Sequence, residues 1–434
     1  MKRRKSLWLS GLFGLGLVAT FLFGQLPFAP STIGSQPVEA QTVEELRGFW
    51  VDAFHPGIKS PSEVDKLIAD VKKANANAIF AQVRRRGDAY YNSNIEPRTN
   101  DPNLVPGFDA LDYLIDRAHA EGIEVHAWMV TLPVYKEGGV TTTAPSHVWQ
   151  QHGPNAPGRD NWAMMTLGGE APGFLDPGHP EVADYTISVY LDVLRNYDVD
   201  GLHLDYIRYD GTDWGYNPTA VARFRKETNR TDTPAPSDPQ WSQWRRDRVT
   251  DLVRGLYQQA TAIDPDVKIS AAVIAWGEGP SDRDSWYRTR TYSEVYQDWR
   301  GWLEEGIIDL AIPMTYHRDG DPNQRVWYDR WVEFAKNNQY DRHVAIGVGA
   351  YLNSSDSTIS QLRRAQAPSR SGQMVRGQVI YSYANSNLDA MEGDTYSNDR
   401  FYGMLPQVWR SPARIPDMPW KRSVATSSAP AETQ

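Results

Sequence analysis

The sequence predicts an α/β fold, a closed (β/α)₈ TIM barrel with long loops after its third and fourth strands. Short apolar runs rich in β-branched and aromatic residues alternate with amphipathic helical stretches eight times along the chain. Several runs are apolar on both faces, as are parallel strands buried between a barrel interior and outer helices. An open doubly wound sheet is the alternative, but the first run lacks the Gly-rich phosphate turn that such sheets often carry.

The predicted strands are LRGFWVDAF (46–54), NAIFAQVR (77–84), IEVHAWMVT (123–131), VDGLHLDYI (199–207), VKISAAVIA (267–275), IIDLAIPMTY (307–316), HVAIGVGAY (343–351) and GQVIYSYA (377–384). Helices are predicted between them. Ser60, Pro61 and Glu63 form a capping-box pattern that starts the first helix. An apolar stripe over residues 108–118 predicts the second helix, which ends before Gly122.

Two connections are longer than plain turns. Residues 132–179 follow the third strand and residues 208–240 follow the fourth, so both lie on the C-terminal face, where such barrels place their sites. We interpret them as the walls of a groove; simple packing against the barrel is the other interpretation. We expect Trp128 and at least one further tryptophan to border that groove, the candidates being Trp162, Trp214 and Trp276.

The two ends of the chain differ from the rest. Residues 1–40 combine a positive start, an apolar run and small residues near Ala40, which predicts a signal peptide cleaved before Gln41. The mature protein is then periplasmic or secreted, and no second apolar run predicts a membrane span; an uncleaved anchor is the alternative. Residues 41–410 form the predicted barrel domain. Residues 411–434, rich in Pro, Ser, Ala and Thr, are predicted to form a flexible tail.

Composition narrows the class of function. The net charge of −9 argues against a nucleic-acid partner, which would require a basic face. The chain has no cysteine, which excludes disulfides and thiolate chemistry. The 16 Trp and 22 Tyr either fill a large core or line a sugar-binding groove, where their apolar faces pack on sugar rings.

Polar residues gather near the carboxyl ends of the predicted strands, where burial is costly unless the residues serve a site. Residues two apart point to one side of a strand, so such pairs converge on one pocket if that side faces the barrel interior. The residues predicted to bind substrate are Asp52, Gln82, Arg84, His126, Trp128, His203, Tyr316, His317 and Tyr383.

Carboxylates decide the predicted chemistry, because glycoside hydrolysis uses two carboxyl groups with opposed protonation. Asp205 ends the fourth strand with His203 beside it, and a basic neighbour would keep it ionised as the nucleophile or stabilising base. Glu278, just after the fifth strand, is the predicted acid. Asp176 and Asp52 are weaker candidates for that role.

Three stretches resemble one family, glycosyl-hydrolase-like family ten: LRGFWVDAF, QVRRRGDAYYNS, and LDPGHPEVADYTISVYLDVLRNYDVDGLHLDYIRYD. The resemblance implies an extracytoplasmic barrel that hydrolyses glycosidic bonds, in some members those of peptidoglycan glycan strands. It also implies functional roles for Arg84, His203 and Asp205. The chain departs from the family pattern at Tyr206, where a second Asp is common, and at Arg85 and Arg86, in place of a usual Pro.

The combined prediction is an exported glycoside hydrolase that cleaves a polysaccharide and needs no cofactor or metal. A metal-dependent hydrolase is one alternative, because four histidines end strands near Asp205: His55, His126, His203 and His317. Against it, single histidines on separate strands lack the spacing typical of metal sites. The other alternative is a barrel that binds glycans without cleaving them.

Overall fold

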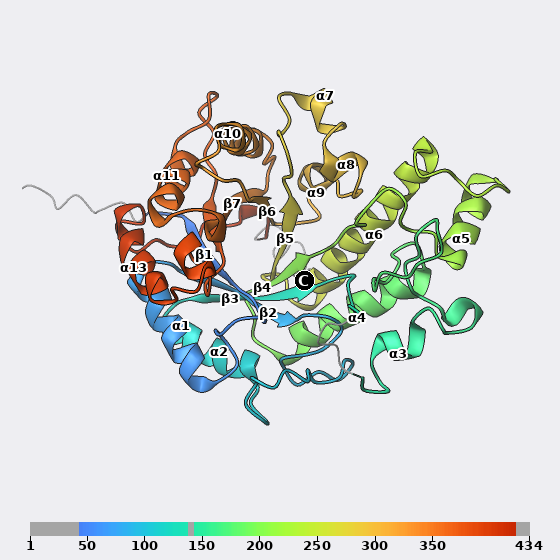
Figure 1. Cartoon of the computed structure of the whole chain (residues 1–434), viewed down its shortest axis with the longest axis horizontal. Coiled ribbons are helices and arrows are strands. Elements are labelled where there is room, and N and C mark those ends of the chain that lie inside the picture. The colour runs from blue at the N-terminus through green and yellow to red at the C-terminus, as the bar shows by residue number, and fades with distance from the viewer. Residues whose placement is uncertain (1–42, 138–142, 422–434) are drawn as a thin grey trace, which may run out of the picture. The chain divides into compact units, whose positions relative to one another are not determined.

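The protein is described from a computed structural model, which covers residues 43–137 and 143–421. Eight parallel strands close into a barrel in chain order, with β8 pairing back to β1. Figure 1 shows the strands in the middle and the helices arranged around them. The predicted closed (β/α)₈ barrel is therefore confirmed. The predicted signal peptide and residues 422–434 lie outside the described residues.

Every observed strand lies inside the run predicted for it. The strands are β1 Leu46–Val51, β2 Ala78–Arg84, β3 Glu124–Val130, β4 Gly201–Asp205, β5 Lys268–Ile274, β6 Leu310–Thr315, β7 His343–Gly349 and β8 Gly377–Tyr381. Four of them, β1, β4, β7 and β8, end two or three residues before the predicted run does, because the last residues turn into the loops above the barrel.

The helices cover the outside of the barrel and extend its loops. They are α1 Pro61–Lys73, α2 Ala110–His119, α3 Val148–His152, α4 Pro180–Asn196, α5 Pro218–Thr228, α6 Pro239–Ile263, α7 Arg283–Trp286, α8 Arg290–Ser293, α9 Trp299–Glu305, α10 Pro322–Asn337, α11 Ser355–Gln366, α12 Leu388–Met391 and α13 Tyr396–Met404, with short 3₁₀ turns η1 Gly158–Asp160, η2 Ala350–Leu352 and η3 Leu405–Gln407. Within the described residues, no helix combines the length and apolar character needed to cross a bilayer.

The start of α1 explains why the chain becomes helical there. The hydroxyl of Ser60 accepts a hydrogen bond from the backbone N–H of Glu63 at 3.2 Å, and Pro61 occupies the first turn. The Glu63 carboxylate accepts from the N–H groups of Gly57 and Lys59 and not from that of Ser60. The predicted capping box is thus half formed, and its second half orders the loop that leads into the helix.

Alternation along β1 shows how the strands divide their side chains between two layers. Phe49 points outward and packs edge-on against Tyr402 and Trp409. Trp50 points into the barrel, where it fits because β7 has a glycine opposite it: a Cβ on Gly347 would lie 2.7 Å from the Trp50 ring. The large interior side chain of one strand therefore lies opposite a residue with no side chain on another strand. Such pairing fills the barrel interior and leaves no channel.

Residues 411–421 pack on the N-terminal end of the barrel. Lys421 Nζ donates to Asp309 Oδ2 and to the carbonyl of Val267, each at 2.7 Å, and Trp420 Nε1 donates to Asp309 Oδ1 at 2.7 Å. Met418 is buried with the barrel-interior cluster. The prediction of a flexible tail is therefore wrong for these residues. A few large side chains suffice to hold a segment whose composition otherwise resembles a linker.

Candidate active site

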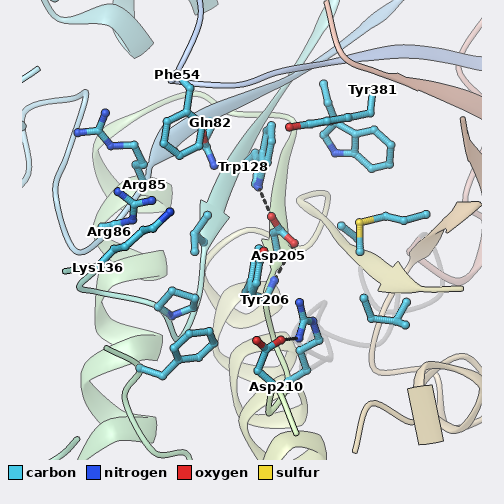
Figure 2. Close-up of a pocket in the computed structure, with 18 of the residues that line it drawn as sticks. Phe54, Gln82, Arg85, Arg86, Trp128, Lys136, Asp205, Tyr206, Asp210 and Tyr381 are labelled. Carbon is cyan, nitrogen blue, oxygen red and sulfur yellow. Dashed lines mark hydrogen bonds and ion pairs between the residues drawn. The ribbon is translucent and has the colours of Figure 1, made fainter. Parts of the chain in front are cut away.

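A pocket of about 670 Å³ opens above the carboxyl ends of the strands. Its walls come from the ends of β1 to β6 and of β8, and from the segments that follow each of β1 to β7. Figure 2 shows Asp205 in the middle, with Arg86 and Lys136 to one side and Tyr381 to the other. This is the face on which barrels of this class place their sites.

Asp205 is the last residue of β4, and it is held by hydrogen bonds from the end of β3 and from the residue that follows it. Its carbonyl accepts from the N–H of Thr131 at 2.8 Å, which continues the pairing with β3. One carboxylate oxygen, Oδ1, accepts from the N–H of Tyr206 at 2.7 Å, and Oδ2 accepts from Trp128 Nε1 at 3.1 Å. Tyr206 adopts a left-handed conformation with φ 51°, which turns the chain directly after the carboxylate. The side chain is 6% exposed and faces the pocket.

Burial changes the acid–base character of Asp205. Loss of solvation raises the pKa of this carboxyl group to about 6, against the opposing effects of the Arg208 charge and of the hydrogen bonds from Tyr206 and Trp128. The sequence predicts that a basic neighbour keeps Asp205 ionised; burial instead raises the pKa of this group, because its effect exceeds that of the Arg208 charge. Near neutral pH, the group can hold a proton or release it.

His203 lies beneath the pocket and not in its lining. Its Nε2 is 2.9 Å from the indole Nε1 of Trp50, and its Nδ1 is 2.8 Å from the Ser270 hydroxyl. Because an indole N–H only donates, Nε2 accepts and Nδ1 carries the proton. Complete burial holds the pKa of His203 well below its usual value. The predicted roles, a cation beside Asp205 and a substrate ligand, are both wrong: this neutral histidine joins β1, β4 and β5 inside the barrel.

Arg84 also differs from its predicted position. The register between β2 and β3 shifts between Gln82 and Arg84, so the two side chains do not share a side. The guanidinium makes two bonds to Glu96, at 2.7 and 2.8 Å, and donates to the carbonyls of Val130 and Thr131. Arg84 is therefore a buried support of the β3 end, and it positions the strand next to Asp205 without lining the pocket.

His126 lies too deep to reach a ligand. It is fully buried and stacks on Phe80 with ring centroids 4.4 Å apart, one layer below Trp128 on the same strand. His126 does point into the barrel, as strand alternation predicts, but the interior holds more than one layer of side chains. Only the upper member of the pair, Trp128, lines the pocket.

Glu278, the predicted acid, lies outside the pocket. The loop after β5 turns outward through Gly277 and Gly279, both at positive φ. The carboxylate pairs with Arg330 on α10 and its side chain is 66% exposed. This exposed ion pair is not part of the pocket lining, so the structure does not place Glu278 beside Asp205 as the acid. The part of this loop that lines the pocket is Trp276.

The two weaker acid candidates are buried structural groups. Asp176 is fully buried and accepts from the N–H of Gly178 at 2.8 Å; its burial raises its pKa to about 6, but it does not line the pocket. Asp52 accepts from the N–H groups of Phe54 and His55 and from the His55 ring. Asp52 therefore shapes the turn after β1 and does not line the pocket, contrary to the prediction that it binds substrate.

Of the remaining residues predicted to bind substrate, two line the pocket and two do not. Gln82 lines the pocket and its Oε1 accepts from the N–H of Ala53 at 2.8 Å, and Tyr316 lines the pocket as well. His317 lies in a smaller adjoining pocket of about 460 Å³. The prediction for Tyr383 is wrong, because its hydroxyl donates to Asp70 at 2.8 Å on the outside of the barrel. Tyr381, two residues earlier, lines the pocket instead.

Aromatic side chains form much of the pocket wall, as predicted for tryptophan. Trp128, Trp214 and Trp276 all line it. Trp162 does not, because it stacks on His152 with centroids 3.5 Å apart inside the β3–α4 connection. The wall therefore offers several flat apolar faces around one buried carboxyl group, which suits sugar rings.

The four histidines of the metal-site alternative do not converge. His126 and His203 are inside the barrel, His55 pairs with Asp52 on the rim, and His317 lies in the adjoining pocket. Across residues 43–137 and 143–421, no group of three or more His, Asp or Glu side chains is arranged to hold a metal ion.

A comparison of the sequence with models of known protein families identifies the family of this chain. The model of glycosyl hydrolase-like 10 matches residues 45–361, most of the chain. The chain belongs to this family. Membership of glycosyl hydrolase-like 10 confirms the resemblance drawn from the sequence motifs, and it confirms the predicted enzyme class, a glycosidase, at the level of the family.

Individual relatives agree with that assignment. Glycosyl hydrolase YngK of Bacillus subtilis (strain 168) is 27% identical over 413 residues, covering 89% of this chain and 76% of the relative. Glycosyl hydrolase DigH of Escherichia coli (strain K12) is 28% identical over 322 residues, covering 68% of each. The solved glycoside hydrolase domain of PgaB (BpsB) from Bordetella bronchiseptica has a TM-score of 0.57 at 16% identity, covering 83% of this chain and 99% of that domain. At this identity, the structural likeness shows the fold alone.

Several pocket residues of this glycosyl hydrolase-like 10 member were missed by the sequence analysis. Five are charged: Arg85, Arg86, Lys136, Arg208 and Asp210. All of them lie in loops after β2, β3 and β4, where strand periodicity gives no direction for a side chain. The one available signal was the pair Arg85 and Arg86, which stood out as a departure from the family pattern.

Proposed function

We propose that this member of glycosyl hydrolase-like 10 hydrolyses a carbohydrate polymer in the pocket above β4, with Asp205 as the proton donor. The observation that carries the proposal is the environment of Asp205: a buried carboxyl group, with its pKa raised to about 6, faces a pocket walled by aromatic rings. A general acid works best when its pKa lies close to the operating pH.

In the proposed reaction, protonated Asp205 transfers its proton to the glycosidic oxygen as the bond from that oxygen to the anomeric carbon breaks. Trp128 and the N–H of Tyr206 donate to the carboxylate that is left, which stabilises the charge as it forms. Water completes the hydrolysis at the anomeric carbon. The products are a new reducing end and a free hydroxyl on the leaving sugar.

A second carboxyl group is needed to activate water or to attack directly. Among the described residues that line the pocket, the other carboxylate is Asp210. It pairs with Arg208, whose guanidinium also stacks 4.4 Å from the Tyr206 ring centroid and 5.1 Å from that of Trp276. We assign Asp210 as the candidate partner of Asp205, in the place that the sequence analysis gave to Glu278.

For the substrate, we propose peptidoglycan glycan strands as the first polymer to test, because the sequence motifs resemble a family in which some members act on them. We further propose that the protein works outside the cytoplasm, as periplasmic or secreted enzyme. The support for this location is the pattern of residues 1–40 alone. Sequencing the N-terminus of the protein recovered from the cell envelope or medium tests it: a start at Gln41 is expected, and an intact Met1 in the cytoplasm contradicts it.

The test of function is product analysis after incubation with a panel of polymers that includes glycan strands stripped of their stem peptides. New reducing ends are expected with at least one polymer, and the anomeric configuration of the first product then separates retention from inversion. Saturable binding without any new reducing end, across the whole panel, would contradict hydrolysis and support the non-catalytic glycan-binding alternative.

A further inference from the structure

A second, smaller pocket of about 460 Å³ adjoins the main pocket, at the carboxyl ends of β5 and β6 and between α8 and α10. Two side chains, Trp276 and Tyr316, line both pockets. The two pockets therefore meet at these side chains. The proposed hydrolysis uses only the main pocket, although the volume of the smaller one lies within the range of roughly 300–1,000 Å³ typical of ligand sites.

Trp276 forms part of the boundary between the two pockets and is held by a residue of each. The guanidinium of Arg208, which lines the main pocket, lies 5.1 Å from the centroid of the Trp276 ring. The guanidinium of Arg290, which lines the smaller pocket, lies 5.0 Å from the same centroid. Contacts of this kind between a cation and an indole ring are attractive. The boundary that the two pockets share is therefore fixed in place.

His317, in the smaller pocket, is fixed by a set of buried hydrogen bonds. The residue is 4% exposed, and its carbonyl accepts from the side-chain amides of Asn353 at 3.0 Å and of Gln361 at 2.9 Å. Its ring Nε2 lies 3.3 Å from the carbonyl of Gly277, which also accepts from the indole N–H of Trp331 at 3.1 Å. These bonds join the ends of β5 and β6 to α10 and α11, so the smaller pocket is preformed.

Trp327 supplies an aromatic surface to the smaller pocket. It lies on α10, is half-buried, and meets the His317 ring edge-on with centroids 6.2 Å apart. Burial lowers the pKa of His317, so its ring is neutral near pH 7. Among the described residues that line this pocket, the charged one is Arg290, which pairs with Glu294 at 2.7 Å. An indole ring beside neutral polar groups suits a sugar ring better than an ion.

We propose that the smaller pocket binds a further sugar of the same glycan chain whose scissile bond lies above Asp205, with Trp327 as the surface on which that sugar packs. This inference rests on the proposed function of the main pocket. A polymer has to leave the main pocket across its rim, and the shared residues Trp276 and Tyr316 join that pocket to a second preformed one. A chain that spans both pockets gains the contacts of both, because its first bound sugar holds the next one close to the second pocket.

The experiment measures how affinity grows with the length of an oligosaccharide. The ligands are the disaccharide, tetrasaccharide and hexasaccharide of two series, peptidoglycan glycan strands stripped of stem peptides and chitin. Dissociation constants are measured by calorimetry on the Asp205→Asn protein, which keeps the ligand intact during the titration, and cleavage of the same ligands by the wild type is followed in parallel.

Three substitutions are added to the Asp205→Asn protein. Trp327→Ala removes the proposed surface, and Trp327→Phe keeps a ring there. Trp420→Ala is the matched control, because Trp420 is also half-buried but lies at the opposite end of the barrel, where it binds Asp309. Matching circular dichroism spectra show that the variants are folded.

We expect the hexasaccharide of at least one series to bind to the Asp205→Asn protein about tenfold or more tightly than the disaccharide. Trp327→Ala should reduce this ratio to about threefold or less, because the added sugar loses its aromatic contact. Trp327→Phe should retain most of the ratio, and Trp420→Ala should retain all of it.

Equal affinity of the Asp205→Asn protein for short and long oligosaccharides, or no binding in either series, would overturn the proposal. A length dependence that survives Trp327→Ala, or that falls as far in Trp420→Ala, would overturn it too. Because the readout is binding, a length dependence that Trp327→Ala removes, without cleavage by the wild type, would contradict the proposed hydrolysis and leave this inference standing. Cleavage without such a length dependence would do the reverse.

Discussion

The indole Nε1 of Trp128 on β3 lies 3.1 Å from Oδ2 of Asp205 on β4. The two residues pair across adjacent parallel strands, at the point where both strands reach the pocket. One aromatic side chain thus forms part of the wall and donates to the buried carboxyl group. The shape of the pocket and the acidity of Asp205 are coupled through this contact.

Replacing Trp128 by Phe should move the pH dependence of activity upward. The ring stays in the wall, but the lost hydrogen bond had favoured the ionised form, so the pKa of Asp205 rises further above about 6. Since the proposed acid must be protonated, wild-type kcat/KM falls as pH rises through that value, and the variant should fall up to about one pH unit later. Rate profiles from about pH 4 to pH 9 measure this; an unmoved alkaline limb would show that Asp205 is not the titrating acid.

Asp205→Asn should change how stability depends on pH. The pKa of Asp205 is raised from 3.8 to about 6 in the folded protein, so the unfolded chain loses its proton first as pH rises. Wild-type stability therefore falls between these two values, and an amide removes that fall. From about pH 4.5 to about pH 7.5, the wild type should lose about 2 kcal/mol relative to the variant. Urea unfolding at both pH values measures it, and a constant difference between the two proteins would contradict the burial argument.

Glu278→Gln should leave turnover of the polymer within about twofold of the wild type. Its carboxylate pairs with Arg330 on the surface, and exposed pairs of this kind contribute about 0–1 kcal/mol to stability. Steady-state kinetics on the best polymer of the panel measures this. A loss of several orders of magnitude would return Glu278 to the role of acid and require the loop after β5 to close over the pocket.

Trp276→Ala should weaken substrate binding by about 1–3 kcal/mol, the scale of one buried aromatic contact. Its ring lines the pocket with Arg208 5.1 Å from its centroid and Arg290 5.0 Å from it, so its orientation is fixed. The effect should appear in KM or in calorimetric affinity. Tyr396→Ala, an exposed aromatic outside the pocket, is the control and should change neither.

The fold could be predicted from the sequence because its pattern is repeated. Eight apolar runs separated by helical stripes give the order and the approximate bounds of every strand, and the closed barrel follows from their number. The end of the chain could not be predicted in the same way. Residues 411–421 have a linker-like composition, yet Trp420 and Lys421 bind Asp309 at the base of the barrel, a contact that no local pattern reveals.

The site was partly predictable, for reasons that differ by residue. Asp205 and Trp128 follow from strand alternation, which is a local rule. Arg84 was misplaced by a shift of register in β2, and His203 by the depth of the barrel interior, which period-two reasoning does not give. Side chains in loops, such as Lys136, take their direction from tertiary packing.

The most direct test of the account is turnover of the polymer by Asp205→Asn. We expect kcat/KM to fall by a factor of about 10² to 10⁴ or more, because the proton donor is removed, while the dissociation constant for the same polymer stays within a few-fold of the wild type. A circular dichroism spectrum that matches the wild type completes the comparison. An Asp205→Asn variant that cleaves the polymer at a rate within about tenfold of the wild type would contradict the central claim that this pocket acts through Asp205.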